Sequence, residues 1–530
     1  MAAIDIVEFP GTPAAASGRE TAFRSVLFLH PEDVPAGHPE PPDFFVDLNL
    51  DQLFEEIAAD RAEYDLGPFF RTPLRSLDAI HYRHEVMRDV EAAEVRACLD
   101  AFAAAMQSMR RRLETADKLH YQRQRQRWLL AAAETYCDAV DRLSESLAGI
   151  GLSSRGLIAF RLYLRTYTNS ERYLRLRNEV REAAAALSDV QFNMLVQDNR
   201  IRVRKYAGEA DYSKDVLATF DRFKQGKAQD YSTKFKTYND MNHVKAAVLD
   251  MVARLFPHPF GLLSAFVASH AGYLDETIAR FDREIQFYIA WQEAFGRLRK
   301  SGLQFCYPKI STREKAMSAH STFDAALAFK LLRDGKTVIT NDFHLAGRER
   351  VIVVSGPNQG GKTTFARMFG QLHYLARLGC QVPGREARLF LFDRLFTHFE
   401  RGEAVENRRG KLQDDLVRIH RILGDATPAS IVIMNEIFTS TSLKDAVFLS
   451  RKVLEKVLAL DALCVCVTFI DELASLSDKT VSMVSTVYPD NPAERTFKIV
   501  RRPADGRAYA MAIARKYRLT YDDLARRLAP

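Results

Sequence analysis

The spacing of apolar residues divides the chain into regions with different patterns. From about residue 46 to 310, apolar side chains recur every three or four positions, as in residues 94–116 and 172–198, with Arg, Glu and Gln between them. This is the period of long amphipathic α-helices, so the pattern predicts a helical domain over residues 46–310. Residues 1–45 are rich in Pro, Gly and Ala and show no period, which favours an irregular segment.

The pattern changes after about residue 310. Short runs of apolar and β-branched residues alternate there with helix-like stretches. The runs are residues 337–340, 351–354, 430–434 and 463–468. Alternating strands and helices are typical of an α/β domain with a mainly parallel sheet. We therefore expect this fold over residues 311–530.

A phosphate-binding loop follows the run at 351–354. The chain matches G-x-x-x-x-G-K-[ST] there and continues into a helix-compatible stretch. The loop residues are Gly356, Pro357, Asn358, Gln359, Gly360, Gly361, Lys362, Thr363 and Thr364. Loop N–H groups and the helix N-terminus attract a triphosphate. We expect Lys362 to reach the β- and γ-phosphates of ATP and the Thr363 hydroxyl to bind Mg²⁺.

A carboxylate follows another apolar run. Residues 431–434 precede Asn435 and Glu436, where a P-loop protein usually carries an Asp that supports Mg²⁺ and then a Glu. Asn435 can accept a hydrogen bond from a Mg²⁺-bound water but brings no charge, so we expect weak Mg²⁺ binding. Glu436 is the candidate general base or water-orienting group.

One basic stretch interrupts the helical pattern. Residues 199–240 carry many Arg and Lys interleaved with Tyr and Phe, and residues 199–206 alternate as a short strand does. Such an insertion at the tip of long helices can contact a phosphate backbone. The candidate DNA-contacting residues are Arg202, Arg204, Lys205, Lys234 and Lys236. Several aspartates dilute the charge, and a solvated face is the alternative.

Composition limits the class and location of the protein. The 530 residues carry a formal net charge of +7, which permits nucleic-acid contact without demanding it. None of the six cysteines forms a C-x-x-C pair, so we expect a reducing compartment and no structural zinc. The N-terminus lacks a basic-then-apolar signal, and no apolar run approaches the about 20 residues of a membrane span. We therefore expect a cytoplasmic protein that does not contact a membrane.

Five ordered segments resemble the MutS family of DNA mismatch-repair ATPases. Residues 356–364 are similar to that family's G-P-N-M-G-G-K-S-T. Residues 376–384 resemble its A-x-x-G-x-x-V-P-A, and residues 392–397 its I-D-x-I-F-T-R. Residues 435–442 resemble its D-E-I-x-R-G-T-S, and residues 505–514 a compressed D-G-x-x-x-x-S-Y-G-L-x-x-A. Five matches in order are far more specific than a P-loop alone.

The resemblance implies a fold, cofactors and partners. It implies an ABC-type ATPase domain preceded by a core and lever domain of long helices, with the insertion at 199–240 as a DNA clamp. Residues 70–80 resemble the start of the core, and residues 245–298 the lever. It also implies ATP and Mg²⁺ as cofactors, double-stranded DNA as a partner, a homodimer with composite sites, and Asn341 near the adenine base.

The chain departs from the family in several places. Only about 45 to 70 residues precede the helical core, so we expect neither the mismatch-reading domain nor its connector. The Ser-Thr signature that contacts a partner's γ-phosphate is missing from residues 409–415. Phe469 stands where the family has a histidine, and Val338 stands where an aromatic residue stacks on adenine.

These features predict a slow Mg²⁺-dependent ATPase that binds DNA structures or recombination and repair intermediates rather than mismatches. Its catalytic residues are Glu436 and Lys362, and its Mg²⁺ is held by Thr363 and, through water, by Asn435. An ATP-stabilised dimeric scaffold with little turnover, whose helical arms bind proteins, is the alternative. A small-molecule kinase is a third hypothesis, disfavoured because no acceptor-site or lid signature accompanies the P-loop.

Overall fold

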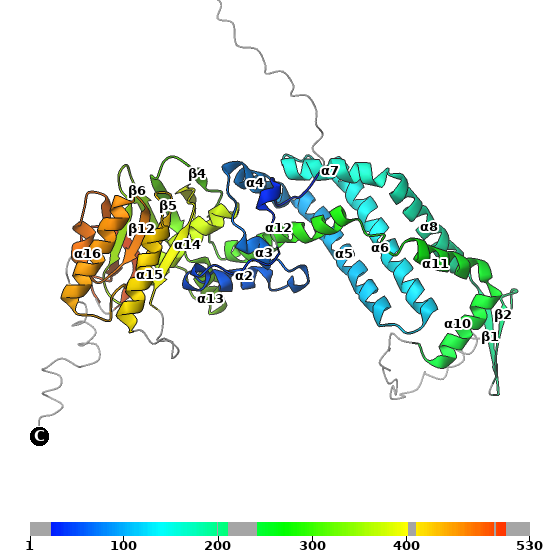
Figure 1. Ribbon diagram of the computed structural model, residues 1–530. Coiled ribbons are helices and arrows are strands. Elements are labelled where there is room, and N and C mark those ends of the chain that lie inside the picture. Colours follow the sequence, from blue (N-terminus) through cyan, green and yellow to red (C-terminus); the bar gives the residue numbers. More distant parts are fainter. Residues whose placement is uncertain are drawn as a thin grey trace, which may run out of the picture.

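The computed structural model describes residues 23–35, 37–198, 200–209, 241–400, 410–491 and 494–504. Within these residues the chain forms an α/β lobe and an elongated helical arm (Figure 1). The long helix α12 (Glu276–Lys300) runs between them. The expected combination of an α/β fold with long helices is therefore present.

The arm consists of long helices packed along one another. Its helices are α4 (Leu77–Glu91), α5 (Ala93–Lys118), α6 (Gln122–Gly149), α7 (Arg155–Thr168), α8 (Glu171–Ser188) and α11 (Pro257–Ser269). Their apolar stripes share one core, in which Phe102 of α5 and Tyr136 of α6 are buried. The helix expected over residues 94–116 is confirmed as α5.

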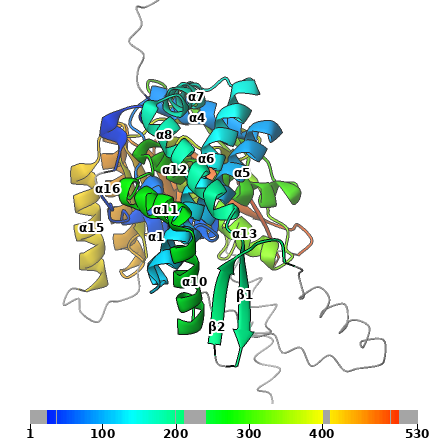
Figure 2. The same ribbon diagram turned by 90° about the vertical axis from the view of Figure 1, so that its right-hand side faces the viewer.

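The far end of the arm carries a β-hairpin. β1 (Phe192–Gln197) pairs antiparallel with β2 (Arg200–Lys205), and α10 (His243–Leu255) packs against β2 (Figure 2). The helix expected over residues 172–198 is wrong in its last part, because α8 ends at Ser188. The sequence of β1 has no charged residue for helical i,i+4 pairs, and pairing with β2 stabilises a strand instead.

A six-stranded sheet forms the centre of the lobe. Its order is β10-β11-β12-β7-β13-β14, and all neighbours are parallel except β13 and β14. The strands are β7 (Val351–Ser355), β10 (Leu395–Phe399), β11 (Ile431–Asn435), β12 (Leu463–Val467), β13 (Thr480–Val487) and β14 (Arg495–Arg501). The strands expected at 351–354, 430–434 and 463–468 are confirmed, within one residue, as β7, β11 and β12.

Helices cover both faces of this sheet. The helices of the lobe are α13 (Ala325–Arg333), α14 (Lys362–Arg377), α15 (Lys411–Asp425), α16 (Leu443–Ala459) and the 3₁₀ turn η3 (Asp471–Ser475). Ile352 and Ile433 share a core with α14, whereas Val353 and Met434 share one with α15 and α16. Both faces of each parallel strand are therefore buried, which explains why these strands are apolar throughout.

A second sheet borders the first, with the order β4-β9-β5-β6. Its strands are β4 (Lys309–Ser311), β5 (Met317–Thr322), β6 (Asn341–Leu345) and β9 (Glu386–Phe390), and β3 (Phe305–Cys306) pairs separately with β8 (Val382–Pro383). The strand expected over residues 337–340 is wrong. These residues have no strand partner, and β6 begins at Asn341, which pairs with Thr322.

The N-terminal part of the chain fills the junction between lobe and arm. Its short elements are the 3₁₀ turns η1 (Pro31–Asp33) and η2 (Ala62–Tyr64) and the helices α1 (Phe44–Asp47), α2 (Leu50–Ala58) and α3 (Gly67–Arg71). Val26 and Leu27 have no regular secondary structure but are completely buried. Part of the segment expected to be irregular therefore belongs to the core.

Hydrogen bonds tie the carboxyl end of α14 to the arm. Leu74 N–H donates to Arg377 O at 2.9 Å, and Arg377 Nε donates to Leu74 O at 3.0 Å. The buried Arg83 of α4 donates to Leu378 O at 2.8 Å and to Leu27 O at 2.9 Å. The helix that begins at the P-loop is thus fixed at its other end to α4 and to the N-terminal segment.

Two general findings concern the described residues. No single helix among them is both long and apolar enough to cross a membrane, and α10 and α11 meet those limits only as a pair bent by 105°. Cys137, Cys380, Cys464 and Cys466 are buried free thiols. The two thiols on β12 pack in the core that the sheet shares with α15 and α16, as the apolar run around them indicates.

Candidate functional site

The phosphate-binding loop joins β7 to α14. The N-cap of α14 is Gly361, whose φ of +90° is a left-handed conformation that glycine adopts without strain. A Cβ at Gly360 would lie 2.2 Å from Ser485 Oγ, so this position also requires glycine. A pocket of about 510 Å³ lies against the loop and is lined by Gly361, Lys362 and Thr363. The amino end of α14 therefore faces a cavity that suits phosphate.

Lys362 is buried, with its ammonium turned into the loop. Its Nζ donates to Gly356 O at 2.9 Å and to Pro357 O at 3.3 Å, and it lies 4.4 Å from the centre of the Phe469 ring. Burial lowers the pKa of Lys362, and the Glu436 carboxylate opposes this shift. A phosphate must therefore compete with the loop carbonyls for this ammonium.

Thr363 and Asn435 meet at the position expected for Mg²⁺. Thr363 Oγ1 donates to Asn435 Oδ1 at 2.9 Å. Asn435 is the last residue of β11 and is buried. A hydroxyl that ligates directly and an amide oxygen that binds through water are both acceptable to Mg²⁺. Because neither is charged, the pair fits a weakly held ion.

Glu436 directly follows this pair and also lines the pocket. It has φ of +55°, and its N–H donates to Val467 O at 2.9 Å, which holds the strained backbone in place. Partial burial raises the pKa of Glu436, while Lys362 lowers it and Glu400 raises it. A fixed carboxylate beside the P-loop lysine can orient a water molecule and accept its proton.

A second carboxylate lies at the same edge of the sheet. Phe399 of β10 is in register with Asn435 of β11, so Glu400 and Glu436 are the next residues of two adjacent parallel strands. Glu400 forms an ion pair with Lys411 at the start of α15. Lys411 lies in the segment that lacks the Ser-Thr signature, whose first residue at position 409 is outside the described residues.

The other end of the pocket has an apolar wall that includes Val338 and Phe497. Asn341 also lines it, but Nδ2 donates to Phe497 O at 3.2 Å, and Oδ1 accepts from Ile499 N–H at 2.8 Å. Both polar atoms of this side chain therefore bind β14. Phe497 has φ of +57° and is 49% exposed. Asn341 thus fixes a strained strand that brings an aromatic residue to the pocket.

The hairpin at the tip of the arm has two different faces. Alternation along β2 puts Arg200, Arg202 and Arg204 on one face, and all three are exposed. Lys205 lies on the other face, and its Nζ is 5.3 Å from the ring centre of Phe256. Lys205 therefore does not lie on the same face as Arg202 and Arg204, with which it was predicted to contact DNA. Lys234 and Lys236 lie outside the described residues.

Sequence reasoning missed Glu400 and Phe497. A signal for Glu400 existed, because it follows the apolar run 395–399 just as Glu436 follows 431–435, and adjacent parallel strands end at one edge. Phe497 belongs to no motif. The position of Phe497 depends on the antiparallel pairing of β14 with β13 and on the hydrogen bonds of Asn341 to β14. The local sequence determines neither of these.

Comparison with known proteins identifies the domain that contains this site. Residues 352–520 match the family model of MutS domain V. The DNA mismatch repair protein MutS of Zymomonas mobilis is 30% identical over 189 residues, which cover 35% of this chain and 22% of that protein. MutS of Chlorobium chlorochromatii is 24% identical over 371 residues, covering 68% of this chain and 40% of the relative.

A protein of another description is also similar. The Endonuclease MutS2 of Thermomicrobium roseum is 29% identical over 199 residues, which cover 37% of this chain and 25% of that protein. The chain thus spans between 22% and 40% of the length of these three relatives. The family match covers the P-loop and the ends of β10 and β11, whereas Val338 and Asn341 of the pocket wall lie outside residues 352–520.

Proposed function

Because residues 352–520 match the family model of MutS domain V, we propose that this chain is a slow ATPase that binds double-stranded DNA. One observation carries the proposal. Lys362 and Thr363 at the start of α14 meet Asn435 and Glu436 at the end of β11 beside one pocket. These are the groups that phosphoryl transfer to water requires.

In the proposed reaction, water attacks the γ-phosphorus of ATP. A new P–O bond forms, the bond to the β–γ bridging oxygen breaks, and ADP and phosphate leave. Glu436 orients the water and accepts its proton, while Lys362 and the loop N–H groups stabilise the charge on the phosphates. Mg²⁺, for which Thr363 and Asn435 are the fitting residues, supplies further neutralisation of the β- and γ-phosphates when bound.

Two observations support slow turnover. The Mg²⁺ corner formed by Thr363 and Asn435 has no charge of its own. In addition, the Lys362 ammonium is already bound by loop carbonyls and covered by the Phe469 ring. To bind the phosphates of ATP, Lys362 must first break its hydrogen bonds to the loop carbonyls. The free energy of breaking them offsets part of the free energy of ATP binding.

We propose that Phe497 stacks on the base of the nucleotide. Val338 offers no aromatic ring, whereas Phe497 lines the same pocket and lies 3.8 Å from where a Gly361 Cβ would be. Strand β14 binds both Nδ2 and Oδ1 of Asn341, which fixes the orientation of this side chain. In this proposal Asn341 positions Phe497 and does not itself read adenine.

DNA contact is assigned to the arginine face of the hairpin. Arg200, Arg202 and Arg204 are exposed, and alternate residues of a strand are about 6.6–6.8 Å apart. Three regularly spaced guanidinium groups can each bind a phosphate along one DNA strand, which basic residues scattered over a surface cannot do. Lys205 is excluded from this contact because it lies against Phe256.

We also propose that the protein acts in the cytoplasm as a homodimer. Nucleotide sites of this family are composite, and the start of α15 occupies the segment from which a partner would be contacted. Gly410 caps α15, and Lys411 is held by Glu400. Lys411 is a cation at this position and is therefore the residue proposed to approach the partner's γ-phosphate.

The first test is ATP hydrolysis by the purified protein with Mg²⁺, with and without duplex DNA. Lys362→Ala and Glu436→Gln are the paired variants. We expect slow phosphate release that DNA stimulates and that both variants abolish, with Glu436→Gln still binding ATP. Release that survives both substitutions would come from a contaminant and would refute the assignment of this site.

One observation favours a second function. The uncharged Asn435 and the covered Lys362 also suit a protein in which bound ATP holds a dimer together with little turnover. In that case, nucleotide binds tightly, no phosphate is released, and the arms bind a protein. Charge reversal on the arginine face then leaves partner binding unchanged, whereas it weakens DNA binding under the main proposal.

A further inference from the structure

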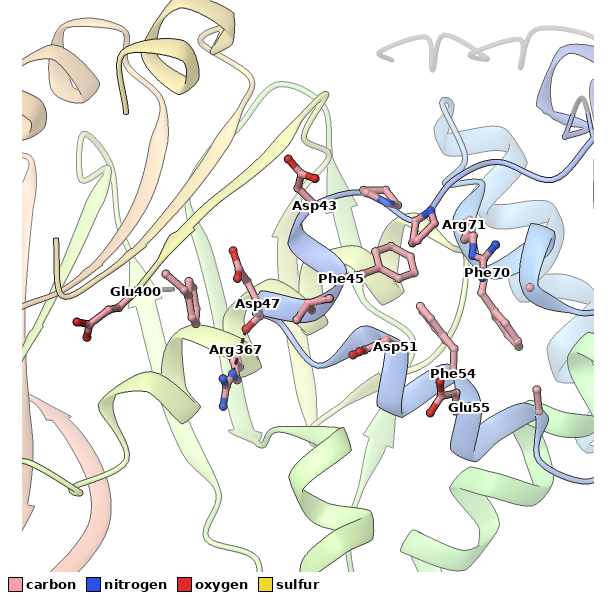
Figure 3. A pocket seen from close by; sticks show the side chains of 16 residues that line it. Asp43, Phe45, Asp47, Asp51, Phe54, Glu55, Phe70, Arg71, Arg367 and Glu400 are labelled. Atoms are coloured by element: carbon pink, nitrogen blue, oxygen red, sulfur yellow. Dashed lines mark hydrogen bonds between the residues drawn. The ribbon is translucent and has the colours of Figure 1, made fainter. Parts of the chain in front are cut away.

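A groove of about 950 Å³ lies beside the nucleotide domain, between the N-terminal helices and the sheet. One wall is apolar and contains Phe45, Phe54 and Phe70, of which Phe54 and Phe70 are stacked with ring centres 4.7 Å apart. The opposite wall includes Arg367 of the P-loop helix α14 and Glu400 at the end of β10 (Figure 3). The groove therefore joins an apolar surface to two elements of the nucleotide site.

Acidic side chains without partners border this apolar wall. Asp43, Asp51 and Glu55 line the groove, and none forms an ion pair with another described residue. Asp51 Oδ1 is buried and has no hydrogen-bond partner among the described residues. A buried carboxylate oxygen without a donor is costly, and because Asp51 as a whole is only half-buried, a cation that approaches from solvent can compensate this carboxylate.

The two cations of the groove do not neutralise these acids. Arg71 Nη1 donates to Pro39 O at 3.2 Å, and Arg367 Nε donates to Asp47 O at 3.0 Å, so each binds a main-chain oxygen. The carboxylate of Asp47 is bound by Arg418. The groove therefore carries a net negative charge.

The arrangement on α2 is also unfavourable by itself. Asp51 and Glu55 are four residues apart on one helix, a spacing at which like charges repel. Asp51 is in the first turn, where the helix dipole favours an acid, but Glu55 lies one turn later and gains little from it. An external cation between the two carboxylates would convert this repulsion into two attractive contacts.

We propose that this groove binds a peptide segment of a partner protein that carries arginine or lysine next to large apolar side chains. The apolar side chains pack on Pro41 and Val46, the exposed apolar residues of the groove, and the cation donates hydrogen bonds to Asp51 and Glu55. Charge-assisted hydrogen bonds of this kind are about twice as strong as neutral ones. DNA is disfavoured at this surface, because its phosphates meet unpaired carboxylates.

The groove lies close to the proposed nucleotide pocket, so binding there can affect that pocket. Arg367 is one turn beyond Thr363 on α14, and Glu400 neighbours Glu436 at the sheet edge. An occupant of the groove therefore contacts both flanks of the nucleotide pocket. This binding does not rest on ATP hydrolysis, so it can be tested whether or not the protein is an ATPase.

The test uses the full chain and a fluorescein-labelled peptide of repeated Leu-Arg-Leu units, with binding followed by fluorescence anisotropy. Asp51→Asn/Glu55→Gln should weaken binding at least about tenfold. Glu145→Gln/Glu182→Gln removes two exposed carboxylates from the arm and serves as the charge-matched control, which should bind as the parent does. Equal weakening by both pairs would mean general charge attraction and would overturn the proposal.

A second probe tests the apolar wall without altering the protein. In this peptide every Leu is replaced by Ser, which keeps the charge. We expect its affinity to fall at least about tenfold, because the apolar contact with Pro41 and Val46 is lost. An unchanged affinity, or equal binding of a Leu-Glu-Leu peptide, would contradict the assigned chemistry. Thermal unfolding of each variant checks that the fold is retained.

Discussion

The hydroxyl of Thr363 donates to the amide oxygen of Asn435 across 2.9 Å, which joins the P-loop helix to the end of β11 without any charge. This contact accounts for two properties at once. It holds the two halves of the nucleotide pocket in register before any ligand arrives. It also gives the proposed Mg²⁺ site a weaker electrostatic field than a carboxylate would.

Asn435→Asp tests the second property. The substitution restores a negative charge while keeping an oxygen for Thr363, so we expect the Mg²⁺ concentration for half-maximal activity to fall and turnover to rise, each by about tenfold. Phosphate release measured against MgCl₂ concentration gives both values. Adding Glu436→Gln to this variant should abolish the gain, and a variant no faster than the parent would show that charge at position 435 is not limiting.

Phe497→Ala tests the base contact. Stacking of a base on an aromatic ring contributes about 1–3 kcal/mol, so we expect the dissociation constant for ATP to rise about tenfold or more, whereas Phe497→Tyr should bind as the parent does. Titration calorimetry measures the constants. Phe448→Ala removes a comparably exposed ring from α16 and is the control. Unchanged affinity in Phe497→Ala would exclude this ring as the base platform.

Reversing the arginine face tests DNA binding. We expect the triple change Arg200→Glu, Arg202→Glu and Arg204→Glu to weaken duplex binding more than tenfold and to flatten its dependence on salt concentration, because fewer counterions are released. Lys205→Glu, on the opposite face, should change the affinity less than about twofold. Electrophoretic mobility shifts at several salt concentrations compare them. Equal effects of the two changes would argue against a one-faced contact.

The buried Glu284 predicts a dependence of stability on pH. Its Oε2 accepts from Ser25 Oγ and from Val26 N–H, both at 2.8 Å, and burial raises its pKa to about 7. A raised pKa means that the folded protein binds the proton more tightly. The stabilisation is therefore complete below about pH 4.5 and is lost as the pH rises through about 7.

Glu284→Gln mimics the protonated side chain and should remove this dependence. At pH 5 we expect similar unfolding free energies for parent and variant, and at pH 8 a variant more stable by up to about 3 kcal/mol. Urea unfolding at both pH values gives the difference. Glu145→Gln, on the exposed surface, should show the same difference from the parent at both values. A difference for Glu284→Gln that is equally constant would contradict the raised pKa.

The sequence allowed the proximity of the candidate site residues to be predicted because the parts of the site are local. Gly361 and Lys362 act within one loop, and Asn435 and Glu436 end an apolar strand that can be identified from burial on both faces. Long amphipathic helices such as α5 were predictable for the same reason. Each of these features is determined by residues fewer than about 30 positions apart.

Features that depend on distant pairing could not be predicted. The change from α8 to β1 depends on pairing with β2. Residues 337–340 do not form the expected strand, because no strand pairs with them. Phe497 reaches the nucleotide pocket through hydrogen bonds from Asn341, which is 156 residues away in the chain. Val26 and Leu27 are buried by helices that follow much later in the chain. The residues around them therefore gave no indication that they would be buried.

The helix α14 is a rigid link between the P-loop and the helical arm. It has 16 residues, about 24 Å at 1.5 Å per residue, with Lys362 at one end and Arg377 bound to Leu74 at the other. The arm helix α6 has 28 residues, about 42 Å. A tilt of about 5° at the junction would thus move the tip of such a helix by about 4 Å. A small shift of the P-loop that tilts α14 would therefore become a displacement of several ångströms at the tip of the arm.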